Sequence, residues 1–323
     1  MSNNNKPVLS IVIPTVNRAT LLEVTLRIAV SLIRDSGQSV ELLVCDNASE
    51  DNTRETVEKV IADCPEVKYI HFNERVSIDH SFKRSVNASS GEYVWVLGDD
   101  DFPLAGSISH FFKAIGNNPE CRFFHFERLT ADPKMSQGTF SFTVINLADQ
   151  KMLGREMIQR VFFRPGFISS FLAHRSLWEG EFDFEPYAGY GFIAWIYSRI
   201  FNEKVVLMGE PLVVQRISAT LWKGEWPRYL LLSQPRILKM LPYDEAEFAK
   251  LLNRWRSAYS RPKQFIYNAI LARSNLFSSK PQWSEVLQYQ SATNRMISCF
   301  SKMLPASLAA YIVKSYLSKK HGK

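Results

Sequence analysis

The sequence has no long apolar run and few cysteines, and both shortages narrow the class of protein. None of its 323 residues lie in a run that approaches the roughly 20 apolar residues of a membrane-spanning helix. The N-terminus lacks the charged start and apolar stretch of a signal peptide. The cysteines show no CxxC pair and no metal-ligand spacing; they are Cys45, Cys64, Cys121 and Cys299. We therefore expect a cytoplasmic protein with reduced thiols and no zinc site.

Glycine is missing where two classes of nucleotide enzyme need it. The segment after the first apolar run, residues 14–18, reads Pro-Thr-Val-Asn-Arg. No GxGxxG motif follows any early strand, which argues against a dinucleotide-dependent oxidoreductase. A nucleotidyltransferase would also carry a glycine-rich phosphate loop at this place, so it is only an alternative interpretation.

Charge is distributed unevenly along the chain. The formal net charge is +7, but residues 251–323 contain twelve Lys or Arg and a single acid, Glu285, so that this segment carries +11. The first 250 residues therefore carry −4. Such a basic segment indicates either an anionic partner, such as lipid headgroups or nucleic acid, or a solvated helical face. Residues 306–320 have the pattern of an interfacial helix on anionic lipid, although packing in a homodimer explains the apolar side equally well.

Short β-branched runs alternate with segments of helical spacing. Strands are expected at residues 8–14, 40–45, 67–72, 93–97, 121–126, 166–173 and 205–217, and helices at 19–33, 51–62, 81–88, 191–201 and beyond 226. This alternation predicts an α/β fold with a doubly wound, mostly parallel central sheet. Polar clusters at 15–18, 46–49 and 99–101 each follow a strand, so we expect them to meet in one crevice at the carboxyl ends.

The acidic run Asp99-Asp100-Asp101 points to a metal. Like charges this close repel by about 1 kcal/mol per pair even in water. A divalent cation removes that cost, and carboxylate oxygens suit Mg²⁺ or Mn²⁺, which is often shared with substrate phosphates. The alternative is a solvated acidic turn before a helix.

The order of motifs carries a family resemblance. Strands are followed by Pro14-Thr15-x-Asn17-Arg18, by Asp46-Asn47-Ala-Ser and, after Gly-Glu-Tyr, by Gly-Asp-Asp-Asp. This combination resembles glycosyltransferase family 2, the inverting GT-A enzymes of bacterial polysaccharide synthesis. The resemblance implies a GT-A domain over residues 1–225, with a nucleotide-binding half at 8–105 and an acceptor half at 106–225. A helical basic C-terminal region would follow at 226–323.

The segment before the fourth strand is similar to the abequosyltransferase-like branch of that family. Members of this branch show Gly-x-Asp-Arg-Asn-Phe, then Ala-Ser-Gly-Glu-Tyr and Leu-Gly-Asp-Asp-Asp. Here Asp79 and Phe82 match, but Ser77, His80 and Ser81 stand at the glycine, arginine and asparagine positions. This departure changes the side chains available for contacts with the donor phosphates.

The resemblance also implies roles for individual residues. The implied donor-binding residues are Pro14, Thr15, Asn17, Arg18, Asp46, Asn47, Asp79, Asp99 and Arg216. Within that set Asp46 would pair with the base and Asp99 would lie near the ribose, while Asp100 would bind the metal on the diphosphate with help from Asp101. Asp46 and Asn47 as plain turn residues, and Asn17 as a helix cap, stay open as alternatives.

The acceptor side is less well defined. Ser169 and Ser170 resemble positions on the strand that faces the acceptor, or they belong to an ordinary strand. An inverting transferase needs a general base, and many family members carry a Glu-Asp pair for it. No such pair occurs at the matching stretch, where Asp183 and Glu185 are the available carboxylates.

The sequence therefore predicts a metal-dependent, inverting glycosyltransferase. It would move a sugar from a nucleotide-diphosphate sugar to a hydroxyl of a lipid-linked oligosaccharide, in O-antigen or capsule synthesis. It would work in the cytoplasm or at the inner face of the cytoplasmic membrane. A catalytically inactive transferase-like binding module stays open beside the nucleotidyltransferase. Nucleic acid is not an expected partner, because strand-end carboxylates repel phosphate unless a metal is present.

Overall fold

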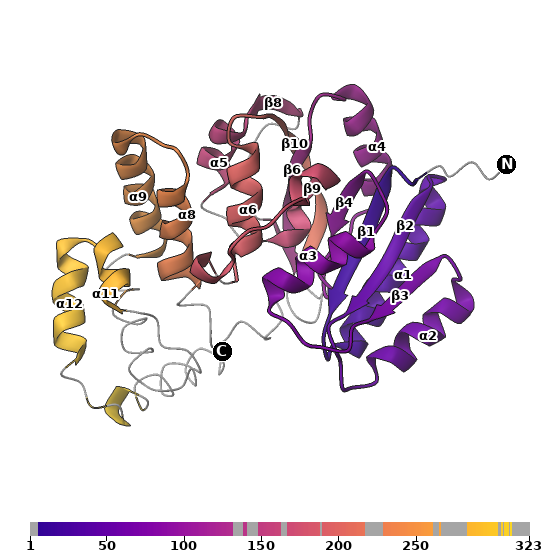
Figure 1. Cartoon of the computed structure of the whole chain (residues 1–323), viewed down its shortest axis with the longest axis horizontal. Coiled ribbons are helices and arrows are strands. Elements are labelled where there is room, and N and C mark those ends of the chain that lie inside the picture. Colours follow the sequence, from indigo (N-terminus) through magenta and orange to yellow (C-terminus); the bar gives the residue numbers. More distant parts are fainter. Residues whose placement is uncertain are drawn as a thin grey trace. The chain divides into compact units, whose positions relative to one another are not determined.

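The computed structural model describes residues 6–131, 138–140, 148–162, 167–187, 189–216, 229–260, 265, 283–302, 305, 307–309 and 311. Its strands are β1 (Leu9–Thr15), β2 (Val40–Asp46), β3 (Val67–His71), β4 (Tyr93–Val96), β5 (Phe102–Pro103), β6 (Phe123–Ala131), β7 (Gly138–Phe140), β8 (Gln150–Leu153), β9 (Phe171–His174) and β10 (Lys204–Arg216). Its α-helices are α1 (Ala19–Ser36), α2 (Thr53–Asp63), α3 (Ile78–Ala88), α4 (Ser107–Asn117), α5 (Gly154–Val161), α6 (Gly191–Ile200), α8 (Gln234–Met240), α9 (Glu245–Tyr259), α11 (Trp283–Val286) and α12 (Ala292–Lys302) (Figure 1). Short helical turns are η1 (Ile168–Ser170), η2 (Arg175–Trp178), η3 (Glu185–Tyr187), η4 (Tyr229–Ser233) and η5 (Leu287–Tyr289).

The described strands form one sheet in the order β3-β2-β1-β4-β9-β6-β10-β5, with β7 on β6 and β8 on β10. The first four strands of that order are parallel, and Thr15 pairs with Asp46 and Asp46 with His71 in the register. Their carboxyl ends are therefore level, which brings the polar segments after β1 and β2 together. Antiparallel pairs join β9 to β4 and β6, while β10 runs parallel to β6. The predicted mostly parallel α/β sheet is confirmed.

Two expected elements differ in detail. The strand expected at residues 166–173 is a 3-10 turn at η1 followed by the shorter strand β9. The hydroxyl of Ser170 donates to the Phe167 carbonyl at 2.8 Å, and such local bonds compete with a strand ladder. Helix α3 begins at Ile78 rather than at Ser81, because the Ser77 side chain accepts from the His80 amide as an N-cap.

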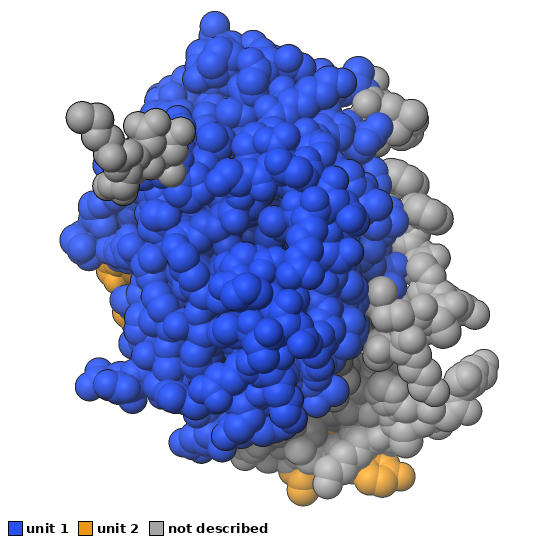
Figure 2. Space-filling view, turned by 90° about the vertical axis from the view of Figure 1, so that its right-hand side faces the viewer, with its two compact units in different colours: residues 1–182, 195–218 blue, residues 183–194, 219–323 orange. Residues whose placement is uncertain are grey.

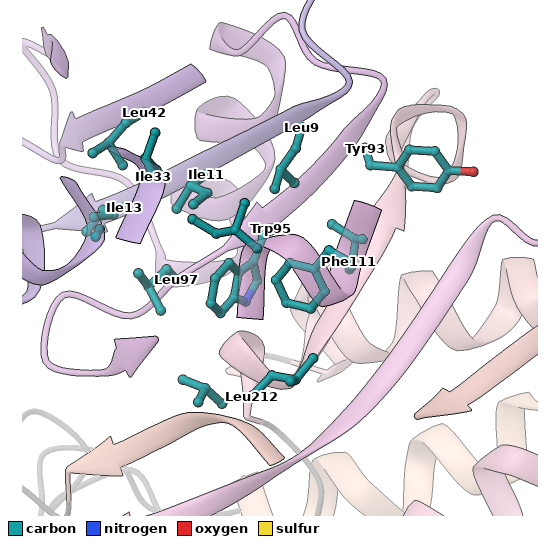
Figure 3. Close-up of a cluster of buried hydrophobic side chains, with 14 of the residues drawn as sticks. Leu9, Ile11, Ile13, Ile33, Leu42, Tyr93, Trp95, Leu97, Phe111 and Leu212 are labelled. Carbon is teal, nitrogen blue, oxygen red and sulfur yellow. The ribbon is translucent and has the colours of Figure 1, made fainter. Parts of the chain in front are cut away.

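A dense apolar core lies under the first strands. Alternate residues of β1 and β4 face the same side of the sheet, and Figure 3 shows Leu9, Ile11 and Ile13 beside Trp95. The Trp95 ring meets Phe111 of α4 edge to face, with ring centroids 4.9 Å apart. Helices α1, α2 and α4 supply the opposing apolar residues. The strand ends that carry the polar loops therefore rest on a rigid base.

The chain forms two compact units. Unit 1 comprises residues 1–182 and 195–218, and unit 2 comprises residues 183–194 and 219–323 (Figure 2, blue and orange). Unit 2 contains helices α8, α9, α11 and α12, which confirms a helical C-terminal region. Within it Arg236 pairs with Glu285 and donates to the Pro186 carbonyl at 2.6 Å. The domain boundary expected at residue 225 stays a prediction.

No helix among the described residues combines the length and the apolar character that crossing a bilayer requires.

Candidate donor site

The loops after β1, β2 and β4 are joined by direct hydrogen bonds. Thr15 donates through its hydroxyl to Asp99 at 2.8 Å, and the Asn47 amide donates to the Thr15 carbonyl at 2.8 Å. Asn17 accepts from the Glu50 amide at 2.7 Å, while its own amide donates to Ser49. The structure therefore brings the three predicted polar clusters together at one end of the sheet.

Arg18 is the charge at the centre of this cluster. Its guanidinium lies 2.8 Å from the Asp99 carboxylate and 2.5 Å from that of Asp100. The Arg18 and Asp99 side chains are 12% and 7% exposed, and that of Asp100 is 15% exposed. Burial raises the pKa of Asp99 to about 6, against the opposing effect of the Arg18 charge. The two carboxylates thus share one buried cation from the chain itself.

Asp101 contacts a different part of unit 1. Ser169 donates to its carboxylate at 2.6 Å and accepts from the Gly98 amide at 2.8 Å. The Trp95 indole donates to the Ser169 carbonyl at 2.9 Å. Burial raises the pKa of Asp101 well above its usual value, and the neighbouring charge of Asp100 raises it further. A β-carbon at Gly98 would lie 2.3 Å from the Asp101 carboxylate, so this loop is closely packed against Ser169.

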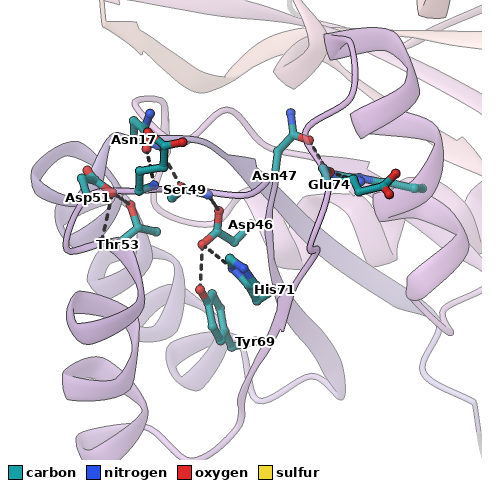
Figure 4. Close-up of polar contacts among 11 residues, drawn as sticks. Asn17, Asp46, Asn47, Ser49, Asp51, Thr53, Tyr69, His71 and Glu74 are labelled. Carbon is teal, nitrogen blue, oxygen red and sulfur yellow. Dashed lines mark hydrogen bonds and ion pairs between the residues drawn. The ribbon is translucent and has the colours of Figure 1, made fainter.

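Asp46 ends β2 and is held on both carboxylate oxygens (Figure 4). The Ser49 amide donates to Oδ1 at 2.8 Å, and the Tyr69 hydroxyl donates to Oδ2 at 2.7 Å. His71 Nδ1 lies 3.2 Å from the same Oδ2. Burial raises the pKa of Asp46, but hydrogen bonds from Ser49, Tyr69 and His71 outweigh this effect and lower it. The Asp46 side chain is buried, with 1% of its surface exposed.

Asn47 links the same loop to the start of α3. Its side chain exchanges two hydrogen bonds of 3.0 Å with the backbone of Val76, and it also accepts from Arg84. The Arg84 guanidinium stacks on the Phe72 ring at 3.9 Å. Asn47 therefore fixes the segment that leads into α3, where Asp79 is buried in the first turn.

The remaining predicted donor residues lie at the edges of this site. Pro14 is half-buried near the end of β1, opposite Cys45 of β2. Arg216 ends β10, and its guanidinium lies 4.6 Å from the ring centroid of Phe102, the residue directly after Asp101. The pairing of Phe102 with Val214 brings that strand end next to the acidic loop.

The predicted acceptor and base residues divide between the two units. Ser169 and Ser170 are buried in unit 1 at η1. Asp183 and Glu185 are exposed in unit 2, where Asp183 accepts from the Glu185 amide at 3.1 Å. The identity of the base stays a prediction.

Sequence reasoning missed three side chains that support the site. Tyr69 and His71 hold Asp46, and Thr25 of α1 donates to the Asp99 carbonyl at 3.0 Å. Tyr69 and His71 could have been found, because alternate residues of a strand beside Asp46 face the same side. Thr25 is a polar residue on the apolar face of its helix, which is a weaker sign.

The carboxylates of Asp99 and Asp100 suit a divalent cation that takes its other ligands from a bound substrate. Among the described residues no group of three His, Cys, Asp or Glu side chains is arranged to hold a metal. Asp99 and the predicted metal ligand Asp100 share the Arg18 guanidinium. Mg²⁺ is commonly bound by only one or two carboxylates together with substrate phosphates, so these residues fit such a site.

Solved structures with this architecture are GT-A transferases. S. aureus TarS, residues 1–349, has a TM-score of 0.63 and 12% identity, over 98% of this chain and 92% of that one. The same segment in complex with UDP-GlcNAc has a TM-score of 0.61 and 12% identity, over 96% and 92%. Mannosyltransferase PcManGT from Pyrobaculum calidifontis, in complex with GDP-Man and Mn²⁺, has a TM-score of 0.56 and 14% identity, over 96% and 88%. These matches establish a GT-A fold.

The family follows from the sequence match. The model of glycosyl transferase family 2 matches residues 10–171, and the chain belongs to this family. The chain is also 32% identical to GalNAc(5)-diNAcBac-PP-undecaprenol beta-1,3-glucosyltransferase of Campylobacter jejuni, over 104 residues. That match covers 32% of this chain and 33% of the relative, so the chain matches only about a third of that protein's length. The family resemblance predicted from the motifs is confirmed.

Proposed function

We propose that this protein is a glycosyltransferase that moves a sugar from a nucleotide-diphosphate sugar to a hydroxyl of a lipid-linked oligosaccharide. The observation that carries this proposal is the union of three loops at the carboxyl ends of β1, β2 and β4 around Asp46, Asp99 and Asp100. Family membership and the GT-A fold support it. The named acceptor of the C. jejuni relative is a sugar chain on a lipid diphosphate, which supports the acceptor class.

In this proposal each loop binds one part of the donor. Asp46 accepts from the base through Oδ1, with its carboxylate oriented by Tyr69 and His71. Asp99 lies near the ribose, and Arg216 lies near the diphosphate. Asp79, Asn17 and Pro14 complete the pocket, while Asn47 positions the start of α3.

Asp100 is the proposed ligand of Mg²⁺ or Mn²⁺, together with the donor diphosphate. When bound, such a metal neutralises the charge that develops on the leaving diphosphate. Asp101 was predicted to assist, but its carboxylate lies against Ser169 and would have to leave it to reach a metal. We therefore assign the metal to Asp100 first and to Asp101 second.

The reaction inverts the anomeric centre, which requires one base to take the proton of the acceptor hydroxyl. Asp183 and Glu185 are the candidates, and Ser169 and Ser170 are the proposed acceptor contacts. Asp183→Asn and Glu185→Gln should be compared by their turnover numbers. The base is the residue whose amide variant loses at least 100-fold in kcat with unchanged nucleotide affinity.

Nucleotide binding tests the donor site. UDP, CDP, GDP and dTDP should be titrated by calorimetry with and without Mn²⁺, on the wild type, on Asp100→Ala and on the exposed control Asp35→Ala. We expect metal-dependent binding of one nucleotide that Asp100→Ala abolishes and Asp35→Ala preserves.

Two outcomes would change the proposal. If no nucleotide binds to folded protein in the presence of metal, the transferase proposal is wrong. If one nucleotide binds but its sugar donor is neither transferred nor hydrolysed, the chain is a catalytically inactive binding module.

We further propose that this transfer serves O-antigen or capsule synthesis. Its setting would be the cytoplasm, with peripheral contact at the inner face of the membrane where lipid-linked acceptors are displayed. The strong positive charge of residues 251–323 supports that contact.

A further inference from the structure

Arg18 bridges the carboxylates of Asp99 and Asp100, and Asp100 is the proposed metal ligand. The two terminal nitrogens of Arg18 reach one carboxylate each, at 2.8 Å to Asp99 and 2.5 Å to Asp100. The Arg18 side chain is only 12% exposed. Thr15 fixes the second oxygen of Asp99, and Thr25 fixes its backbone carbonyl. The charge of the acidic pair is therefore partly compensated, and both carboxylates are oriented, without any added ion.

This arrangement sets up a competition between two cations. The guanidinium keeps its proton at any physiological pH, so Arg18 cannot make room by losing its charge. A divalent ion beside it would experience strong repulsion at a site with little water. Arg18 and a metal on Asp100 therefore exclude each other unless the side chain moves.

The backbone at Arg18 is fixed, so only its side chain can move. The residue precedes α1, and its carbonyl accepts from the amides of Leu21 and Leu22 at 3.0 Å each. Asn17 before it has a positive φ of 54° and is held by its bonds to Ser49 and Glu50. Because the Arg18 backbone is held in this way, its guanidinium would stay near the loops after β1, β2 and β4 when it leaves the two carboxylates. A nucleotide diphosphate there offers it a new bidentate anionic partner.

We infer that Arg18 is an internal counter-ion, whose guanidinium must leave Asp100 before that carboxylate could hold a metal and would then pair with the donor diphosphate. This inference rests on the proposed donor and metal site. It makes metal and nucleotide binding cooperative. A bound nucleotide would hold the guanidinium away from Asp100, and a bound metal would release the guanidinium for the diphosphate. The contact with Arg18 also keeps Asp100 from holding a metal while the donor pocket is empty.

Mn²⁺ binding without nucleotide is the direct test. Calorimetry or the electron paramagnetic resonance of free Mn²⁺ would be measured for the wild type, Arg18→Gln, Arg18→Lys and Asp100→Ala. Arg27→Gln is the matched control, since Arg27 lies on α1 in an exposed pair with Glu23. We expect Arg18→Gln to bind Mn²⁺ about tenfold more tightly than the wild type, in the usual range of such couplings. Arg18→Lys should fall between them, because one ammonium cannot bridge both carboxylates as a guanidinium fork does.

A second measurement adds whichever nucleoside diphosphate of the panel binds the wild type. That nucleotide should tighten Mn²⁺ binding strongly in the wild type and much less in Arg18→Gln. Equal Mn²⁺ affinity of folded Arg18→Gln, Arg18→Lys and wild type would overturn the inference while leaving the donor site intact. If Asp100→Ala binds Mn²⁺ as well as the wild type does with that nucleotide present, the metal assignment in the proposed function is wrong instead.

Discussion

Asp100 and Asp101 are neighbours in the chain, yet their carboxylates contact different partners. Asp100 faces Arg18, whereas Asp101 is buried against Ser169 and only 4% exposed. Three adjacent carboxylates would repel one another, but here Asp99 and Asp100 share the Arg18 guanidinium while Asp101 accepts from Ser169. Burial raises the pKa of Asp101 well above its usual value. Residue type alone therefore does not set the role of an acid in this run.

Ser169→Ala tests the anchoring of this loop. The variant removes the hydroxyl that donates to Asp101 and accepts from the Gly98 amide, so it leaves buried polar groups unpaired. We expect unfolding in urea to show a loss of about 1–3 kcal/mol and nucleotide affinity to fall several-fold.

Ser170→Ala is the matched control, because its hydroxyl bonds only the Phe167 carbonyl among the contacts described for that hydroxyl. It should cost about 1 kcal/mol and leave nucleotide affinity unchanged. Equal nucleotide affinity in both variants would show that the bond from Ser169 does not hold the donor loop.

At the scale of elements, a buried carboxylate joins the amino ends of the parallel strands. Glu41 of β2 accepts from Ser10 of β1 at 2.5 Å and from the Ser90 amide before β4 at 2.7 Å. Lys68 of β3 donates to its other oxygen at 2.8 Å. Four strands are thus connected at the end of the sheet opposite the donor loops.

Glu41 should make stability depend on acid pH. Burial raises its pKa, but the bonds from Lys68, Ser10 and Ser90 outweigh burial and lower the pKa from 4.5 to about 2. A carboxyl with a lowered folded-state pKa stabilises the fold above its unfolded pKa. That contribution, about 3 kcal/mol at most, is lost as pH falls from roughly 5 towards 2.

Urea unfolding across this pH range would measure the effect. Glu41→Gln should be less stable at neutral pH and should lose less stability on acidification than the wild type. The exposed control Glu23→Gln should follow the wild-type curve. Parallel curves for Glu41→Gln and the wild type would contradict the assignment.

The sequence predicted the elements well where one physical rule dominates. Buried parallel strands such as β1 and β2 are short, mostly apolar runs, and the polar segments after them share an edge of the sheet. The turn at η1 was not predicted, because the competing bond from Ser170 to Phe167 is local and looks like any serine in a strand. The different directions of Asp100 and Asp101 depend on Arg18 and Ser169, which are 82 and 68 residues away. Tertiary contacts of that kind cannot be read from local pattern.

At the scale of the whole molecule, charge separates the ends of the chain. Residues 251–323 carry +11 and the remainder carries −4. Anionic lipid attracts the basic segment 251–323 but does not attract the acidic first 250 residues.

Co-sedimentation with liposomes tests this separation on the full chain. We expect binding to phosphatidylglycerol vesicles, little binding to phosphatidylcholine vesicles, and release by salt, since surface attraction is screened. Lys314→Gln, Lys319→Gln and Lys320→Gln combined should weaken binding. The same number of changes at the exposed Lys6, Lys59 and Lys113 is the control. Salt-insensitive binding, or no difference between the two triple variants, would leave a homodimer or internal packing as the better account of the apolar C-terminal stretch.

The shared hydroxyl of Ser169 has a consequence for how this family diversifies. Gly98, Asp101 and Ser169 depend on one another. A β-carbon at Gly98 would collide with the Asp101 carboxylate, and the Ser169 hydroxyl hydrogen-bonds both the Gly98 amide and that carboxylate. A change at any one of them leaves a buried group without its complement, so natural variants should replace the three positions together. We therefore expect the turn at η1 and the loop after β4 to tolerate change only together, so that a substitution engineered at one would need a matched substitution at the other.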